Sequence, residues 1–114
     1  MPFRPRSVVA HGALTGEYAR WEADARAGRQ PAPAIWKGLQ TAILRLKLDG
    51  QWGEVIPPRH IPAHFRSRYG VENLYCVDLA SFHRLFYTIL DRDVILLDIV
   101  DHATYDEWFP GSRR

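Results

Sequence analysis

Cysteine is nearly absent from this sequence: Cys76 is the only one among 114 residues, so no disulfide can form within the chain. Such cysteine usage suits a reducing compartment, and we expect a cytoplasmic protein. Long apolar runs are missing as well, since no stretch approaches the roughly 20 residues that cross a bilayer. The apolar part of the first ten residues is too short for a signal peptide. These absences predict no membrane segment and no leader.

Clusters of metal ligands are also lacking. His60 and His64 are close in the sequence, but no dependable third ligand stands beside them, so we expect no zinc site, no other metal and no cofactor. Acidic residues are missing from one stretch, Arg59 to Tyr69. Residues 1–69 carry eleven Lys and Arg against five Asp and Glu, whereas residues 70–114 carry four against eight. This asymmetry favours a polyanion-binding front half, unless the two halves neutralise each other in the folded chain.

Hydrophobic periodicity divides the chain into two parts, and its length fits a single domain over residues 1–114. Apolar residues at helical spacing predict two helices joined by a short loop. After Gly70 the period changes to two, which predicts three strands and a closing helical turn. The expected elements are a short edge strand at 7–11, helices at 14–28 and 33–48, strands at 73–79, 83–90 and 94–100, and the turn at 102–109.

The predicted fold class is therefore α+β, a helical hairpin packed on a small antiparallel sheet in the order β-α-α-β-β-β. The three late strands must be antiparallel neighbours, because connections of two or three residues are too short for a parallel crossover. Both faces of the strand at 94–100 are apolar apart from Asp98, which predicts a central strand covered on both sides. The face opposite the helices stays open unless residues 51–70 or a partner cover it.

Residues 51–70 are rich in proline and in basic groups. Arg59, His64, Arg66 and Arg68 are interspersed with aromatic residues, a pattern typical of RNA binding, because guanidinium groups contact phosphates and aromatic rings stack on bases. The alternative interpretation is a solvated connector stiffened by its prolines.

The segments NLYCVDL, HRLFYTI and IVDHATYDEWF resemble, in order and spacing, the RelE/ParE toxin superfamily, and the resemblance covers residues 7–110. It implies a RelE-like toxin of a type II toxin–antitoxin pair, with an antitoxin protein, messenger RNA and the ribosome as partners. Many members cleave ribosome-bound messenger RNA without a metal, by attack of a 2′-hydroxyl on the neighbouring phosphate. Other members inhibit DNA gyrase or are catalytically inactive and act by protein binding, and this second function stays open.

The resemblance assigns a catalytic role to three residues. Arg84 would stabilise the charge that develops on the phosphate, His102 is the second contributor, and Tyr105 would be an acid or a stacking platform. Structural alternatives remain for two of them: Arg84 pairs with Asp78 or Asp98, and His102 merely begins a helix. The first late strand lacks the lysines of many cleaving relatives, and Asp78 is a candidate base in their place.

Overall fold

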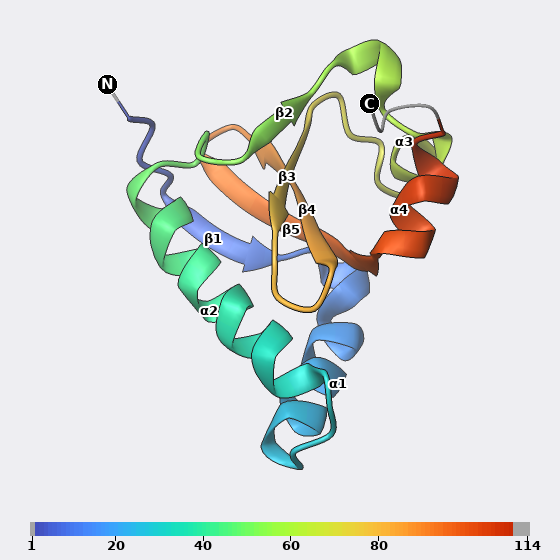
Figure 1. Cartoon of the computed structure of the whole chain (residues 1–114). Coiled ribbons are helices and arrows are strands. Elements are labelled where there is room, and N and C mark those ends of the chain that lie inside the picture. The colour runs from blue at the N-terminus through green and yellow to red at the C-terminus, as the bar shows by residue number, and fades with distance from the viewer. Residues whose placement is uncertain (1, 111–114) are drawn as a thin grey trace.

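A five-stranded sheet forms the centre of the computed structural model, which describes residues 2–110. Its strands are β1 Ser7–Ala10, β2 Glu54–Ile56, β3 Leu74–Asp78, β4 His83–Leu90 and β5 Asp93–Asp101. They lie in the order β1-β5-β4-β3-β2, so that β5 has a neighbour on each side, as predicted (Figure 1). The three late strands form an antiparallel meander, which confirms that part of the predicted fold.

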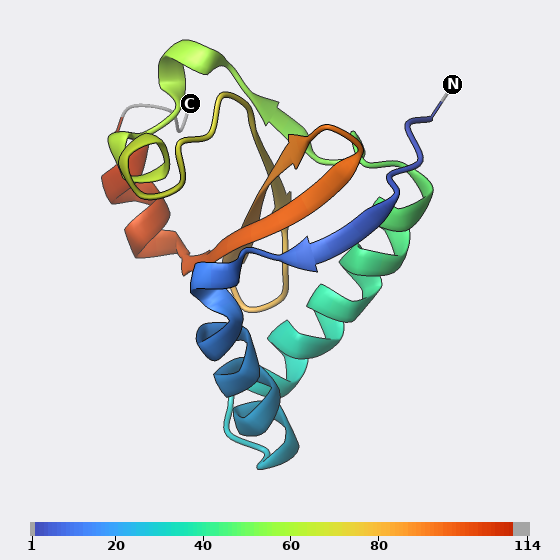
Figure 2. The ribbon, with the colours of Figure 1, turned by 180° about the vertical axis from the view of Figure 1, so that it is seen from behind.

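The sheet as a whole is mixed, so the predicted purely antiparallel sheet is wrong. β1 runs parallel to β5, with Val8 opposite Val94 and Val9 opposite Ile95, and Figure 2 shows the two strands side by side. Such a pair is allowed because the chain between β1 and β5 is long enough for a crossover. At the other edge, β2 pairs antiparallel with β3. A strand of three residues is too short to show alternation, which is why the sequence did not reveal it.

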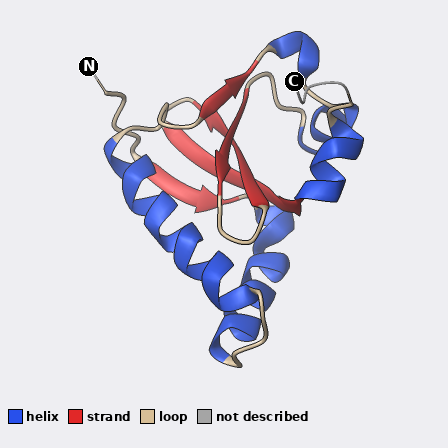
Figure 3. Cartoon of the chain, viewed as in Figure 1, coloured by secondary structure: helices blue, strands red, loops and turns tan. Residues whose placement is uncertain are grey.

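Residues 2–110 contain four α-helices, which flank the sheet (Figure 3): α1 Thr15–Arg26, α2 Ala32–Leu48, α3 Ala63–Tyr69 and α4 His102–Trp108. Short 3-10 turns lie at Gly12–Leu14 and Pro58–His60. The predicted helical hairpin and closing helix are confirmed, but α3 was not predicted. Its signals were present, since Pro62 directly precedes it and Gly70 ends it in the left-handed conformation at φ 65°. None of the described helices is long and apolar enough to cross a membrane.

Each face of the sheet has its own hydrophobic core. On one face α2 packs Leu39, Ala42 and Leu46 against alternate strand residues that include Leu85 and Tyr87. On the other face Phe65 of α3 and Phe109 pack against Phe86, Leu97 and Val100. Residues 51–70 and α4 therefore cover the face that the sequence left open. Alternation in β4 places Arg84 and Phe86 on this second face, while His83 points towards Trp21 of α1.

A β-bulge interrupts the pairing of β4 with β5. Leu85 pairs with Ile99, but Tyr87 pairs with Leu96, so Leu97 and Asp98 together oppose Phe86. Such an extra residue breaks the alternation locally and turns side chains to the same side. Both residues face the core of α3 and α4, and Asp98 becomes a carboxylate that is only 9% exposed.

Candidate functional site

Arg84 of β4 lies at the edge of the second face. Its Nε forms an ion pair with Asp78 Oδ1 at 3.0 Å, and its Nη1 lies 3.9 Å from the sulfur of Cys76. Its guanidinium carbon lies 4.4 Å from the centre of the Tyr105 ring, a cation–π contact. The Arg84 side chain is 24% exposed, and Asp78 is 76% exposed. The predicted alternative pairing with Asp78 is therefore present, but an ion pair with so exposed a partner contributes little to stability.

The electrostatic environment around Arg84 keeps its guanidinium charged and the Cys76 thiol neutral. Burial by itself would lower the pKa of Arg84, but the nearby Cys76 and Asp78 raise it above its ordinary value. Burial raises the pKa of the Cys76 thiol to about 12, although the Arg84 charge opposes this rise. Cys76 therefore remains a thiol at neutral pH, which argues against a nucleophilic role.

His102 is the first residue of α4, and the helix cap fixes its position. Asp101 Oδ1 accepts the backbone N–H of Thr104 at 2.9 Å, as an N-cap residue does. This hydrogen bond holds the pKa of Asp101 below its ordinary value. The imidazole of His102 has two aromatic neighbours, with ring centroids 6.0 Å away for Phe82 and 6.4 Å away for Tyr105.

Arg84 and His102 line the same hollow, which has a volume of about 390 Å³ and is bounded by the turn between β3 and β4. A second hollow of about 310 Å³ begins on the other side of Arg84, where Trp52 and Cys76 contribute to its wall. Arg84 thus presents a cation to both hollows. The Tyr105 hydroxyl makes no hydrogen bond within residues 2–110, so it is free to bond a ligand. The three predicted catalytic residues are therefore neighbours.

The four predicted RNA-binding residues lie elsewhere, and none of them lines either hollow. Arg59 is exposed in the turn before α3 and makes no hydrogen bond or ion pair with a described residue. Arg66 donates to the carbonyl of Pro58 at 2.5 Å. Arg68 lies 3.9 Å from Glu17 Oε1 and covers the ring of Tyr69. Their proposed phosphate contacts stay a prediction, on a surface separate from that of Arg84.

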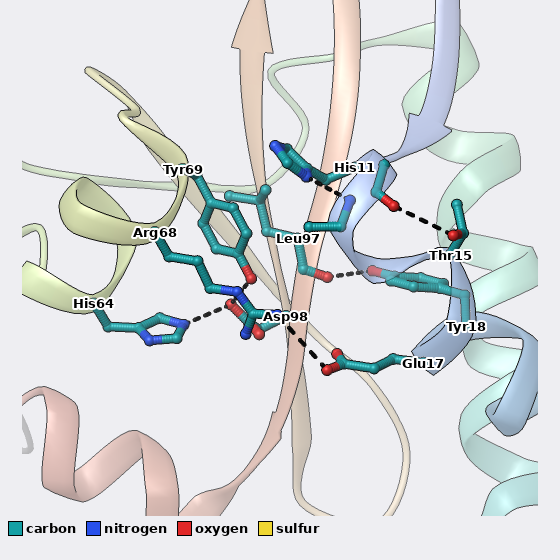
Figure 4. Close-up of polar contacts among 11 residues, drawn as sticks. His11, Thr15, Glu17, Tyr18, His64, Arg68, Tyr69, Leu97 and Asp98 are labelled. Carbon is teal, nitrogen blue, oxygen red and sulfur yellow. Dashed lines mark hydrogen bonds and ion pairs between the residues drawn. The ribbon is translucent and has the colours of Figure 1, made fainter.

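His64 belongs to a polar cluster around the buried Asp98 (Figure 4). Its Nε2 lies 2.9 Å from Asp98 Oδ2, which also accepts the Tyr69 hydroxyl at 2.9 Å. The imidazole stacks on Trp108 of α4 at 4.3 Å. These contacts tie α3 and α4 to β5, so the structural role of His64 is clearer than any role in RNA binding. The sequence signal for this cluster was Asp98 itself, a single carboxylate in an apolar strand.

A second tyrosine supports the bulge next to this cluster. The Tyr18 hydroxyl of α1 donates to the carbonyl of Leu97 (Figure 4). Burial, together with the Asp98 charge, raises the pKa values of both Tyr18 and Tyr69 far above the ordinary value. Both side chains therefore stay protonated donors throughout the physiological range.

The residues that the structure describes contain no group of three or more His, Cys, Asp or Glu side chains placed to hold a metal ion. No protein-family model, curated protein or solved structure matches this chain.

Proposed function

We propose that this chain is a RelE-like toxin that cleaves messenger RNA on the ribosome without a metal. The observation that carries the proposal is the hollow shared by Arg84 and His102, with Tyr105 in contact with both. Cleavage by a 2′-hydroxyl forms a bond from O2′ to phosphorus and breaks the bond to the 5′-oxygen. It requires a base for the hydroxyl, a cation for the charge on the phosphate, and an acid for the leaving oxygen.

Each of the three residues fits one of these tasks. Arg84 supplies a permanent cation at the wall of the hollow. His102 supplies an imidazole, the side chain that proteins use most often for proton transfer. Tyr105 holds the guanidinium on its ring, and its hydroxyl, which has no hydrogen-bond partner among residues 2–110, is the candidate for the remaining proton transfer.

Arg84 is better explained by ligand binding than by structure. Its one ion pair is with an exposed carboxylate, and a phosphate could replace Asp78 at little cost. A cation–π contact at a partly exposed site contributes only about 0.5–1 kcal/mol. The core of the second face is built by residues behind Arg84, such as Phe86, and does not depend on its charge.

The proposed antitoxin has a surface that it can cover. Leu44 and Leu48, one turn apart on α2, are 64% and 58% exposed. Exposed apolar residues that lie close together commonly mark protein contacts. The same surface supports the second candidate, a catalytically inactive relative that acts by binding protein. One observation favours that candidate, namely that Arg84 already has a carboxylate partner in Asp78.

The test is controlled expression with growth measurement and mapping of messenger RNA ends. Arg84→Ala should lower cleavage by about 10²–10³-fold, the usual effect of removing one group that stabilises transition-state charge. Arg20→Ala is the matched control, since Arg20 is an exposed arginine of α1 that lines neither hollow. Circular dichroism should show that both variants are folded. Cleavage by Arg84→Ala at the parent rate would refute the mechanism, and a parent that neither cuts RNA nor arrests growth would favour the binding protein.

A further inference from the structure

The turn between β3 and β4 has an unfavourable backbone conformation. Its two central residues, Ser81 and Phe82, have φ of 56° and 57°, and the N–H of His83 bonds to the carbonyl of Ala80 at 3.2 Å. These are the features of a type I′ hairpin turn, which normally carries Asn-Gly or a similar pair. A bulky residue in the left-handed region is an outlier, because its Cβ is crowded by the backbone. The sequence therefore has a phenylalanine at a position where glycine would give a more stable fold.

The Phe82 ring makes almost no contribution to the core in return. It is 80% exposed, the largest exposed fraction among the exposed large hydrophobic residues of the described chain. Two effects therefore destabilise the folded state at this position: the apolar ring is exposed to water, and the backbone is strained. Strain of this kind is found mainly where function maintains it.

The position of the ring connects it with the proposed site. Phe82 lines the hollow of Arg84 and His102, and its ring lies at 28° to the His102 imidazole. Beyond His102 follow Tyr105 and then Phe109, at interplanar angles of 29° and 19°. The four residues form a chain of neighbouring rings, with centroid distances of 6.0, 6.4 and 4.6 Å, from the buried Phe109 to the exposed turn. Phe82 is the outer end of this chain, and at 80% exposure its ring is accessible to another flat ring.

We propose that Phe82 is the stacking platform for an unpaired base of single-stranded RNA, next to the phosphate held by Arg84. This inference rests on the proposed function, because the phosphate at Arg84 fixes where the attached base must lie. Aromatic residues bind single strands by stacking, which every base permits. Duplex RNA does not fit, since its bases are already stacked and paired. Phe82 would therefore be a substrate-binding residue that also selects for an unpaired strand.

The experiment measures binding to a fluorescent single-stranded 2′-O-methyl oligoribonucleotide of about ten nucleotides, a site size within the range of known single-strand binders. The methyl groups remove the attacking hydroxyl, so the strand binds but cannot be cut. Phe82→Leu removes the ring and keeps a bulky side chain, and it should weaken binding about 5- to 150-fold, the range for losing one stacked base. Phe82→Tyr keeps the ring and should bind within about twofold of the parent. Leu90→Ala, which removes another exposed apolar side chain at the far end of β4, should bind like the parent.

A second variant separates binding from folding. Phe82→Gly should weaken RNA binding as much as Phe82→Leu, yet raise the midpoint of urea unfolding above that of Phe82→Leu, because glycine relieves the backbone strain. Loss of binding in a variant with a more stable fold supports the platform. Equal binding by the parent, Phe82→Leu and Phe82→Gly overturns it, and so does a parent that binds duplex RNA as tightly as the single strand or binds neither.

These results are distinguishable from failure of the proposed cleavage. A parent that binds the uncleavable strand through Phe82 but cuts no messenger RNA supports the platform and refutes only the nuclease activity. A parent that cuts messenger RNA with Arg84 but binds RNA independently of Phe82 overturns only the platform.

Discussion

The cluster around Asp98 gives the sharpest prediction about stability. Tyr69→Phe removes one hydroxyl and leaves the ring that packs against His11 and Phe65. The lost bond is a 2.9 Å contact to a carboxylate that is 9% exposed. Hydrogen bonds to charged groups contribute about 1.5–3 kcal/mol, so the free energy of unfolding should fall by that amount. Urea unfolding followed by fluorescence measures it.

Tyr105→Phe is the matched control for this prediction. Its hydroxyl has no hydrogen-bond partner in the described part of the chain, so its removal should change stability by less than about 0.5 kcal/mol. In an Asp98→Asn background the bond to Tyr69 becomes neutral, and Tyr69→Phe should then cost only about 0.5–1.5 kcal/mol. If Tyr69→Phe costs no more than Tyr105→Phe, the Asp98 carboxylate is solvated and does not hold α3 on the sheet.

Two further predictions concern acid stability and thiol reactivity. Asp101→Ala should cost about 0.5–2 kcal/mol at neutral pH, the usual effect of losing an N-cap. Because the pKa of Asp101 is depressed in the folded chain, the unfolded chain takes up the proton first. The loss in the free energy of unfolding caused by Asp101→Ala should therefore be fully present above the ordinary pKa of about 4. It should decline as the pH falls through the pKa that Asp101 has in the folded chain. Equal losses in urea titrations at pH 7 and about pH 2 would contradict this. Cys76, whose pKa is raised to about 12 by burial, should react with iodoacetamide at pH 8 only after unfolding, and rapid labelling of the native protein would contradict its burial.

Hydrophobic periodicity in the sequence was sufficient to predict the long helices and strands. The apolar stripe of α2 and the alternation in β4 and β5 appear in the sequence because each element buries one or both faces over many residues. Alternation along β4 also places Arg84 and His83 on opposite faces, where Arg84 contacts Tyr105 and His83 contacts Trp21. The short elements β2 and α3 were missed, since three or seven residues give too few repeats for a period to be recognised.

The sequence by itself determined the class of the protein: two amphipathic helices, an antiparallel meander and a group of candidate residues at Arg84, His102 and Tyr105. Only the tertiary structure decided what these residues contact. It paired β1 with β5, used a bulge to turn Asp98 towards His64, and placed Arg84 beside His102 while the basic residues of α3 lie elsewhere. The physical reason is that periodicity is set by burial within one element, whereas pairing, register shifts and hollows arise between elements that are distant in the sequence.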